Sequence, residues 1–134
     1  MSKRKTTILV VEDIEKFQTD PFVVEVEINF ENITFRENPN EALSFVKENL
    51  ETKIIIMLDL MFPAYPMDGL KFLKELRNLS KLIPVIVWSG KGNNIDGTEY
   101  QKMINDSTFA FLSKSASSEE IVNALCKADD YLNS

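Results

Sequence analysis

Residues 53–59, KIIIMLD, form a continuous apolar run that ends on a carboxylate, and this run constrains the fold more than any other feature. A strand with one solvent-exposed face alternates apolar and polar residues, whereas a strand buried on both faces is apolar throughout. Residues 6–12, TTILVVE, have the same continuous character. Such strands are typical of parallel sheets covered by helices on both sides, so we expect an α/β fold.

Apolar runs of strand length alternate with helical patterns along the chain. Residues 38–50 place Ala42, Val46 and Leu50 four apart, and residues 68–79 repeat leucines every three positions. This alternation predicts a single doubly wound (βα)5 domain, with a five-stranded parallel sheet, right-handed crossovers and helices on both faces. The predicted strands are 6–12, 33–37, 53–59, 84–89 and 109–113, and the helical patterns are 38–50, 68–79, 97–106 and 117–132.

Two helix starts are marked by polar residues. Asn38 precedes Pro39, which suits the first helical position, so Asn38 is expected to cap the helix that follows. Ser117 is followed three residues later by Glu120, the spacing of a capping box.

Residues 14–32 carry two conflicting patterns. Phe17, Pro21, Val24 and Ile28 fit a helical stripe, whereas the EVEINF segment alternates as a strand does. Neighbouring parallel strands need a crossover of about a dozen residues or more, usually a helix. We therefore favour a helix between the first two strands.

Length and composition exclude several classes of protein. The 134 residues suit one domain, so we expect a single unit spanning 1–134, with its core at roughly 6–132 and no effector domain. The chain has no histidine and one cysteine, Cys126, which excludes Ser-His-Asp catalysis and the usual zinc sites. A net charge of −6 argues against direct nucleic-acid binding. Without a membrane-length apolar stretch or a signal-peptide pattern, we expect a cytoplasmic protein.

Polar residues follow four of the predicted strands. The first strand leads to Glu12 and Asp13, the third to Asp59, the fourth to Ser89 and the fifth to Lys114. In a parallel sheet these strand ends gather at one edge, where α/β folds bind their ligands. Taken singly, each residue has an ordinary explanation as a helix cap, a turn residue or a solvated lysine. Together they predict a ligand-binding site at this edge of the sheet.

Three carboxylates at one edge need a positive charge, because they repel one another and lose solvation. An all-oxygen set of ligands without histidine or thiolate suits Mg²⁺. An ionised carboxylate beside a metal, a lysine and a hydroxyl can attack a phosphoryl group and become an acyl phosphate. We therefore expect Asp59 to be the nucleophile, with Ser89 and Lys114 contacting the phosphoryl oxygens.

These residues together resemble the response regulator receiver domain, the CheY-like phosphoacceptor of two-component signalling, over roughly residues 6–132. The resemblance implies a flavodoxin-like sheet of order 2-1-3-4-5. It implies Mg²⁺ held by Glu12 or Asp13, by Asp59 and by the backbone carbonyl of Met61, and it makes Phe111 the aromatic switch residue. The matching residues are Glu12, Asp13, Asp59, Ser89 with Gly90, Phe111 and Lys114.

The chain departs from the family pattern at three places. The loop at 62–68 carries about two extra residues before Gly69. Ser115 stands where a proline usually follows the lysine, and a non-proline cis bond there would cost about 2.5–4 kcal/mol. Serine replaces the commoner threonine at position 89 and keeps the hydroxyl.

Because the chain leaves no room for an effector domain, we expect a stand-alone receiver. The resemblance implies that it catalyses only its own phosphorylation and dephosphorylation. A partner histidine kinase or phosphotransfer protein would supply the phosphoryl group. A downstream effector protein or a phosphorylation-dependent homodimer would carry the output, with no contact to nucleic acid or membrane.

Three alternatives remain open from the residues. The first is a receiver-like docking module that is not phosphorylated. The second is an aspartate-nucleophile phosphatase of the haloacid dehalogenase type, which needs an acid where Met61 stands. The third is a flavodoxin-type cofactor binder, for which no phosphate-binding loop is recognisable.

Overall fold

The computed structural model of the chain describes residues 3–11, 21–58, 69–89, 109–113 and 115–134. These residues form a five-stranded sheet of order β2-β1-β3-β4-β5 in which every neighbouring pair of strands is parallel. The predicted fold class and strand order are therefore confirmed. The strands are β1 (Arg4–Val11), β2 (Phe30–Arg36), β3 (Ile54–Leu58), β4 (Val85–Ser89) and β5 (Ala110–Ser113).

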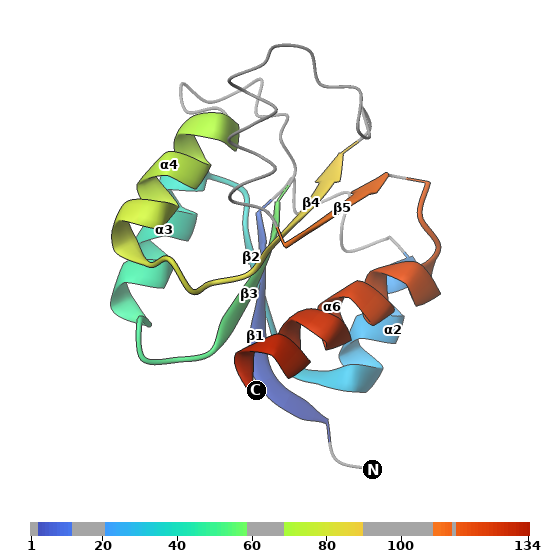
Figure 1. Ribbon diagram of the computed structural model, residues 1–134. Helices are drawn as coiled ribbons and strands as arrows, with labels where there is room; N and C mark the ends of the chain where they lie inside the picture. Colours follow the sequence, from blue (N-terminus) through green and yellow to red (C-terminus); the bar gives the residue numbers. More distant parts are fainter. Residues whose placement is uncertain (1–2, 12–20, 59–68, 90–108, 114) are drawn as a thin grey trace.

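Helices cover both faces of the sheet, as expected (Figure 1). In the described part of the chain, α3 and α4 pack on one face, and α2 and α6 pack on the other. The bounds of these helices are α2 (Pro21–Asn29), α3 (Pro39–Glu48), α4 (Gly69–Leu79) and α6 (Ser118–Leu132).

Two apolar clusters, one on each face, explain why β3 and residues 8–11 of β1 are apolar throughout. Leu9 and Ile56 point into the cluster under α3 and α4, whereas Ile8 and Ile55 point into the cluster under α2 and α6. All four side chains are fully buried. Successive side chains of a strand face opposite sides, so both sides must be apolar when both are covered.

Both predicted helix caps are confirmed. The Asn38 side-chain oxygen accepts a hydrogen bond from the Asn40 amide at 2.8 Å, with Pro39 following as the first helical residue. At α6 the Ser117 hydroxyl oxygen accepts from the Glu120 amide at 3.1 Å, and it donates to the Glu120 carboxylate at 3.3 Å. Each cap satisfies a backbone donor that has no partner within its own helix.

The helix favoured within 14–32 is present as α2, which begins at Pro21; residues 14–20 lie outside the described part. The predicted start of the second strand at Ile33 is wrong, because β2 begins at Phe30. Phe30 is the register partner of Arg4 and is 1 % exposed, so its burial favours the strand over a longer loop. The helix predicted at 97–106 lies outside the described residues.

Among the helices that the structure describes, none combines the length and apolar character needed to cross a membrane.

Candidate functional site

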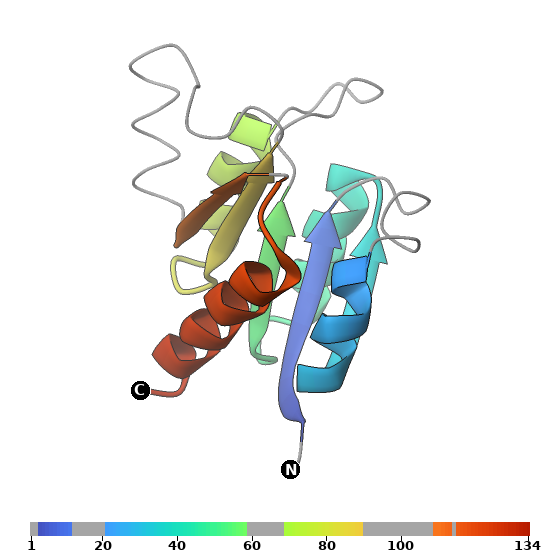
Figure 2. The same ribbon diagram turned by 90° about the vertical axis from the view of Figure 1, so that its right-hand side faces the viewer.

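The carboxyl ends of the strands lie along one edge of the sheet, at the arrowheads in Figure 2. Val11, the last residue of β1, is the register partner of Leu58, the last residue of β3. Leu58 in turn pairs with Val87 of β4, and Ser89 pairs with Ser113 at the end of β5. The chain positions directly after these ends are the ones that carry the predicted chemistry.

Five predicted site residues lie outside the described part of the chain, and so do their contacts: Glu12, Asp13, Asp59, Met61 and Lys114. The backbone of Ser89 is described as the end of β4, while its side chain is not. The structure describes the backbone of the strands that precede them. Glu12 and Asp59 each follow one member of the Val11–Leu58 pair in sequence.

Phe111, the predicted switch residue, is described. It is the register partner of Val87 in β4, and its partly buried ring packs against the cluster beneath α3 and α4. Phe111 is therefore two residues before the end of β5 and in contact with the core. Its position fits a side chain that shifts with the strand end, whereas the switching itself stays a prediction.

Trp88, next to Ser89, faces the opposite side of the sheet. It is 5 % exposed and belongs to the cluster under α2 and α6. Its ring meets the Phe22 ring of α2 edge-on, with centroids 5.1 Å apart and an interplanar angle of 65°. Edge-to-face pairs of this geometry stabilise by about 0.5–1.5 kcal/mol beyond their buried area. The end of β4 thus touches both helical layers.

The described residues contain no group of three carboxylate, cysteine or histidine side chains that could hold a metal. The predicted magnesium ligands all follow strand ends and lie outside that part of the chain. Their chemistry fits Mg²⁺, since three carboxylates and a backbone carbonyl provide only oxygen ligands.

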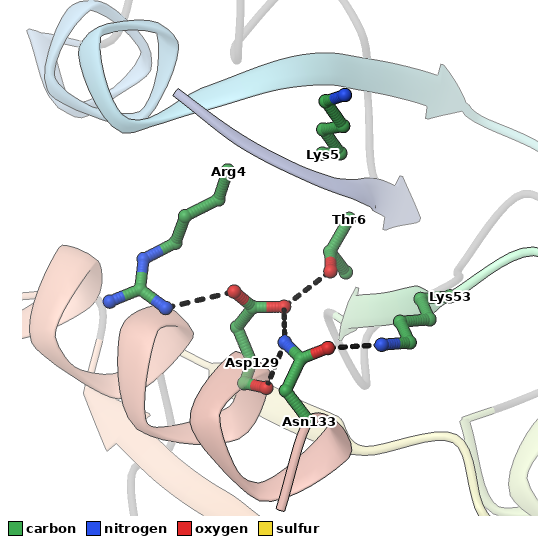
Figure 3. Close-up of a pocket in the computed structure, with 6 residues that line it drawn as sticks. All are labelled: Arg4, Lys5, Thr6, Lys53, Asp129 and Asn133. Atoms are coloured by element: carbon green, nitrogen blue, oxygen red, sulfur yellow. Dashed lines mark hydrogen bonds and ion pairs between the residues drawn. The ribbon is translucent and has the colours of Figure 1, made fainter. Parts of the chain in front are cut away.

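A second polar cluster lies at the opposite, amino-terminal edge of the sheet (Figure 3). Asp129 of α6 is 3 % exposed, and its carboxylate accepts from the Arg4 guanidinium at 2.8 Å, from the Asn133 amide at 3.1 Å and from the Thr6 hydroxyl. Arg4 also pairs with Asp130 at 2.8 Å. Burial by itself would raise the pKa of Asp129, but the hydrogen bonds from Thr6 and Arg4 outweigh it and hold the pKa below its ordinary value.

This amino-terminal cluster borders an open hollow of about 500 Å³, lined by Arg4, Lys5, Thr6, Lys53, Asp129 and Asn133. Its polar groups are largely engaged with one another, because Lys53 donates to the Asn133 side chain while Asn133 donates to Asp129. We interpret the cluster as a structural tie between β1, the start of β3 and α6. No sequence pattern predicted this cluster, although Asp129 follows Leu125 at the four-residue spacing of the apolar stripe on α6.

Comparison with known protein families identifies the chain. The sequence profile of the response regulator receiver domain matches residues 8–126. The chain therefore belongs to the response regulator receiver domain family, and it has the CheY-like, flavodoxin-like fold of two-component signalling proteins. A search of curated protein sequences finds no match.

Solved structures agree on the fold. A receiver domain protein from Clostridium thermocellum matches with a TM-score of 0.77 and 20 % identity, over 94 % of this chain and 95 % of that one. A CheY-like receiver domain protein from Methanospirillum hungatei matches with a TM-score of 0.77 and 18 % identity, over 97 % and 98 %. A structure described as adenylate cyclase from Rhodopirellula baltica matches with a TM-score of 0.78 and 23 % identity, over 97 % and 91 %.

Proposed function

We propose that this receiver domain accepts a phosphoryl group on Asp59 from the phosphohistidine of a partner kinase or phosphotransfer protein, in a Mg²⁺-dependent reaction. Receiver domains are phosphoacceptor signalling domains rather than classical enzymes. The observation that carries the proposal is the register of β1 and β3, in which Val11 and Leu58 pair directly before Glu12 and Asp59. In a parallel sheet this register favours bringing the acids of both strands to one site.

In the proposed transfer, an Asp59 carboxylate oxygen attacks the phosphorus atom while the bond from phosphorus to the histidine nitrogen breaks. The imidazole leaves with the bonding electron pair, and an acyl phosphate forms on Asp59. Glu12 or Asp13, Asp59 and the Met61 carbonyl would hold Mg²⁺. When bound, Mg²⁺ neutralises charge on the phosphoryl oxygens.

Ser89 and Lys114 would then hold the transferred group. The Ser89 hydroxyl donates to one phosphoryl oxygen and the Lys114 ammonium pairs with another, which draws the ends of β4 and β5 toward Asp59. Phe111 shifts with β5, and the altered surface binds a downstream effector protein or a second copy. We infer that the domain acts in the cytoplasm without nucleic-acid or membrane contact.

The test is the intact mass of the protein after incubation with a small phosphoramidate or acyl phosphate donor, with and without Mg²⁺. We expect the wild type to gain one phosphoryl group only when Mg²⁺ is present, and Asp59→Asn to gain none. Asp130→Asn is the matched control, because that side chain is 70 % exposed on α6 and should leave phosphorylation intact. Phosphorylation of Asp59→Asn to the wild-type extent would contradict the proposal. If the folded wild type bound neither phosphoryl group nor beryllofluoride, an unphosphorylated docking module would replace it.

A further inference from the structure

The hollow at the amino edge of the sheet is cationic, although the chain as a whole carries a net charge of −6. Its lining includes three positive side chains, Arg4, Lys5 and Lys53, and one carboxylate, Asp129. Both oxygens of that carboxylate already accept hydrogen bonds, one from Arg4 and the other from two uncharged side chains. The lining therefore has more positive charge than its own carboxylate balances.

Two of these cations are not neutralised by a carboxylate of the described chain. Arg4 pairs with Asp129 and with Asp130, whereas neither Lys5 nor Lys53 forms an ion pair with a described residue. Lys53 has three N–H groups and donates one of them to the side-chain oxygen of Asn133. Figure 3 shows Asp129 and Asn133 between Arg4 and Lys53. The hollow thus offers donors and positive charge to a further acceptor.

The backbone holds these side chains at adjoining positions. Lys5 belongs to β1, and Lys53 directly precedes the neighbouring strand β3. The Thr7 amide donates to the Lys53 carbonyl at 2.9 Å, which fixes the two segments against each other. Asp129, which is 3 % exposed, anchors the guanidinium of Arg4 at the same edge. Positions that are fixed before binding reduce the entropy that a ligand must overcome.

We propose that this hollow binds a small phosphorylated molecule that carries at least two negative charges on its phosphate groups. Its volume of about 500 Å³ is in the range of small-molecule sites. Lysine binds phosphate as a point charge, and a phosphate group offers several acceptor oxygens at once. Lys5 and Lys53 contact the phosphate oxygens, and the buried Asp129 keeps Arg4 beside them. The site is at the edge opposite the strand ends that precede Asp59, so binding does not depend on phosphorylation there.

The experiment titrates the full chain with pyrophosphate, and separately with citrate, at constant ionic strength and without Mg²⁺. Amide chemical shifts locate the binding site, and urea unfolding measures the stabilisation that a ligand of the folded state must produce. We expect the largest pyrophosphate shifts at residues 4–6, 53 and 129–133, a higher urea midpoint, and weaker binding of citrate. Asp59→Asn should bind pyrophosphate as the wild type does, which separates this site from the proposed phosphoryl transfer.

Variants separate the hollow from general attraction between lysines and anions. Lys53→Gln and Lys5→Gln should each weaken pyrophosphate binding about tenfold, because a charge-assisted contact is lost. Lys74→Gln is the matched control, since it removes the same charge from an exposed position on α4 and should not weaken binding. The proposal is overturned by absent binding at millimolar pyrophosphate, by shifts centred elsewhere, by citrate binding as tightly, or by equal effects of Lys53→Gln and Lys74→Gln.

Discussion

Asp129 stands apart among the described residues as the single charged side chain that is buried. Its carboxylate keeps its charge because Arg4, Thr6 and Asn133 all donate to it. A buried charge without such partners would cost several kcal/mol, whereas a satisfied one ties together the groups around it. In this protein it fixes the end of α6 to the beginning of β1.

Replacing Asp129 by asparagine should lower the free energy of unfolding by about 1.5–3 kcal/mol near neutral pH, because hydrogen bonds to a charged group are lost. The folded-state pKa lies below the ordinary value of 3.8, so the carboxylate stabilises the fold above that pH. This stabilisation disappears as the pH falls through the folded-state pKa. Urea unfolding of wild type and variant at several pH values measures the difference, which should shrink in acid.

Asp130→Asn is the control for Asp129→Asn. Asp130 contacts the same guanidinium, but its side chain is 70 % exposed, so its loss should cost at most about 1 kcal/mol. Equal losses for the two variants, or a difference that does not depend on pH, would show that the buried carboxylate has no special role.

At the scale of elements, α6 begins at Ser118, directly after its cap, and follows β5 by only a few residues. Ser117→Ala removes the hydroxyl oxygen that accepts from the Glu120 amide, so we expect a loss of about 1 kcal/mol in the free energy of unfolding. Ser118→Ala, one residue along, is the matched control and should change little. Chemical denaturation of both variants measures this, and similar losses would contradict capping by Ser117.

The elements that the sequence predicts well are those whose signal is local. The apolar run of β3 and the caps of α3 and α6 are contained within a few residues, so each could be recognised without knowing its neighbours. The start of β2 could not, because Phe30 joins the sheet through its pairing with Arg4. The Arg4–Asp129 pair joins residues 125 apart, and no local pattern reports it.

For the candidate site, the sequence could predict which strand ends precede the functional residues. Acids and a lysine after buried runs could be expected at one edge once a parallel sheet was inferred, and the register of Val11 with Leu58 supports that expectation. The side-chain positions of Asp59 and Lys114 could not be predicted, because periodicity reports which residues form a strand and not where the side chains after its end lie.

At the scale of the whole molecule, the two edges of the sheet have different roles, one in the proposed chemistry and one in the stability of the fold. The carboxyl edge leads to the residues of the proposed phosphoryl transfer, whereas the amino edge contains the Asp129 cluster. The two edges should therefore respond independently to substitution, since sites far apart with no shared partners usually act additively.

Beryllofluoride with Mg²⁺, a stand-in for the phosphoryl group, should raise the free energy of unfolding of the wild type by about 2.7 kcal/mol at a hundredfold excess over its Kd. Asp59→Asn should lose this gain entirely. Asp129→Asn should start from lower stability and still show the full gain. Thermal or urea unfolding with and without the ligand measures all three, and a gain retained in Asp59→Asn would contradict the proposed site.

The tie between Arg4 and α6 also determines how this domain can be joined to other proteins. Arg4 lies at the start of β1 and Asn133 directly follows α6, and both belong to the same cluster at the amino edge. A fluorescent protein or an affinity tag fused to either end would therefore leave from the side of the sheet opposite the strand ends that precede Glu12 and Asp59. The domain is consequently suited to fusion at either end, because Arg4 and Asn133 both lie at the edge of the sheet away from those strand ends.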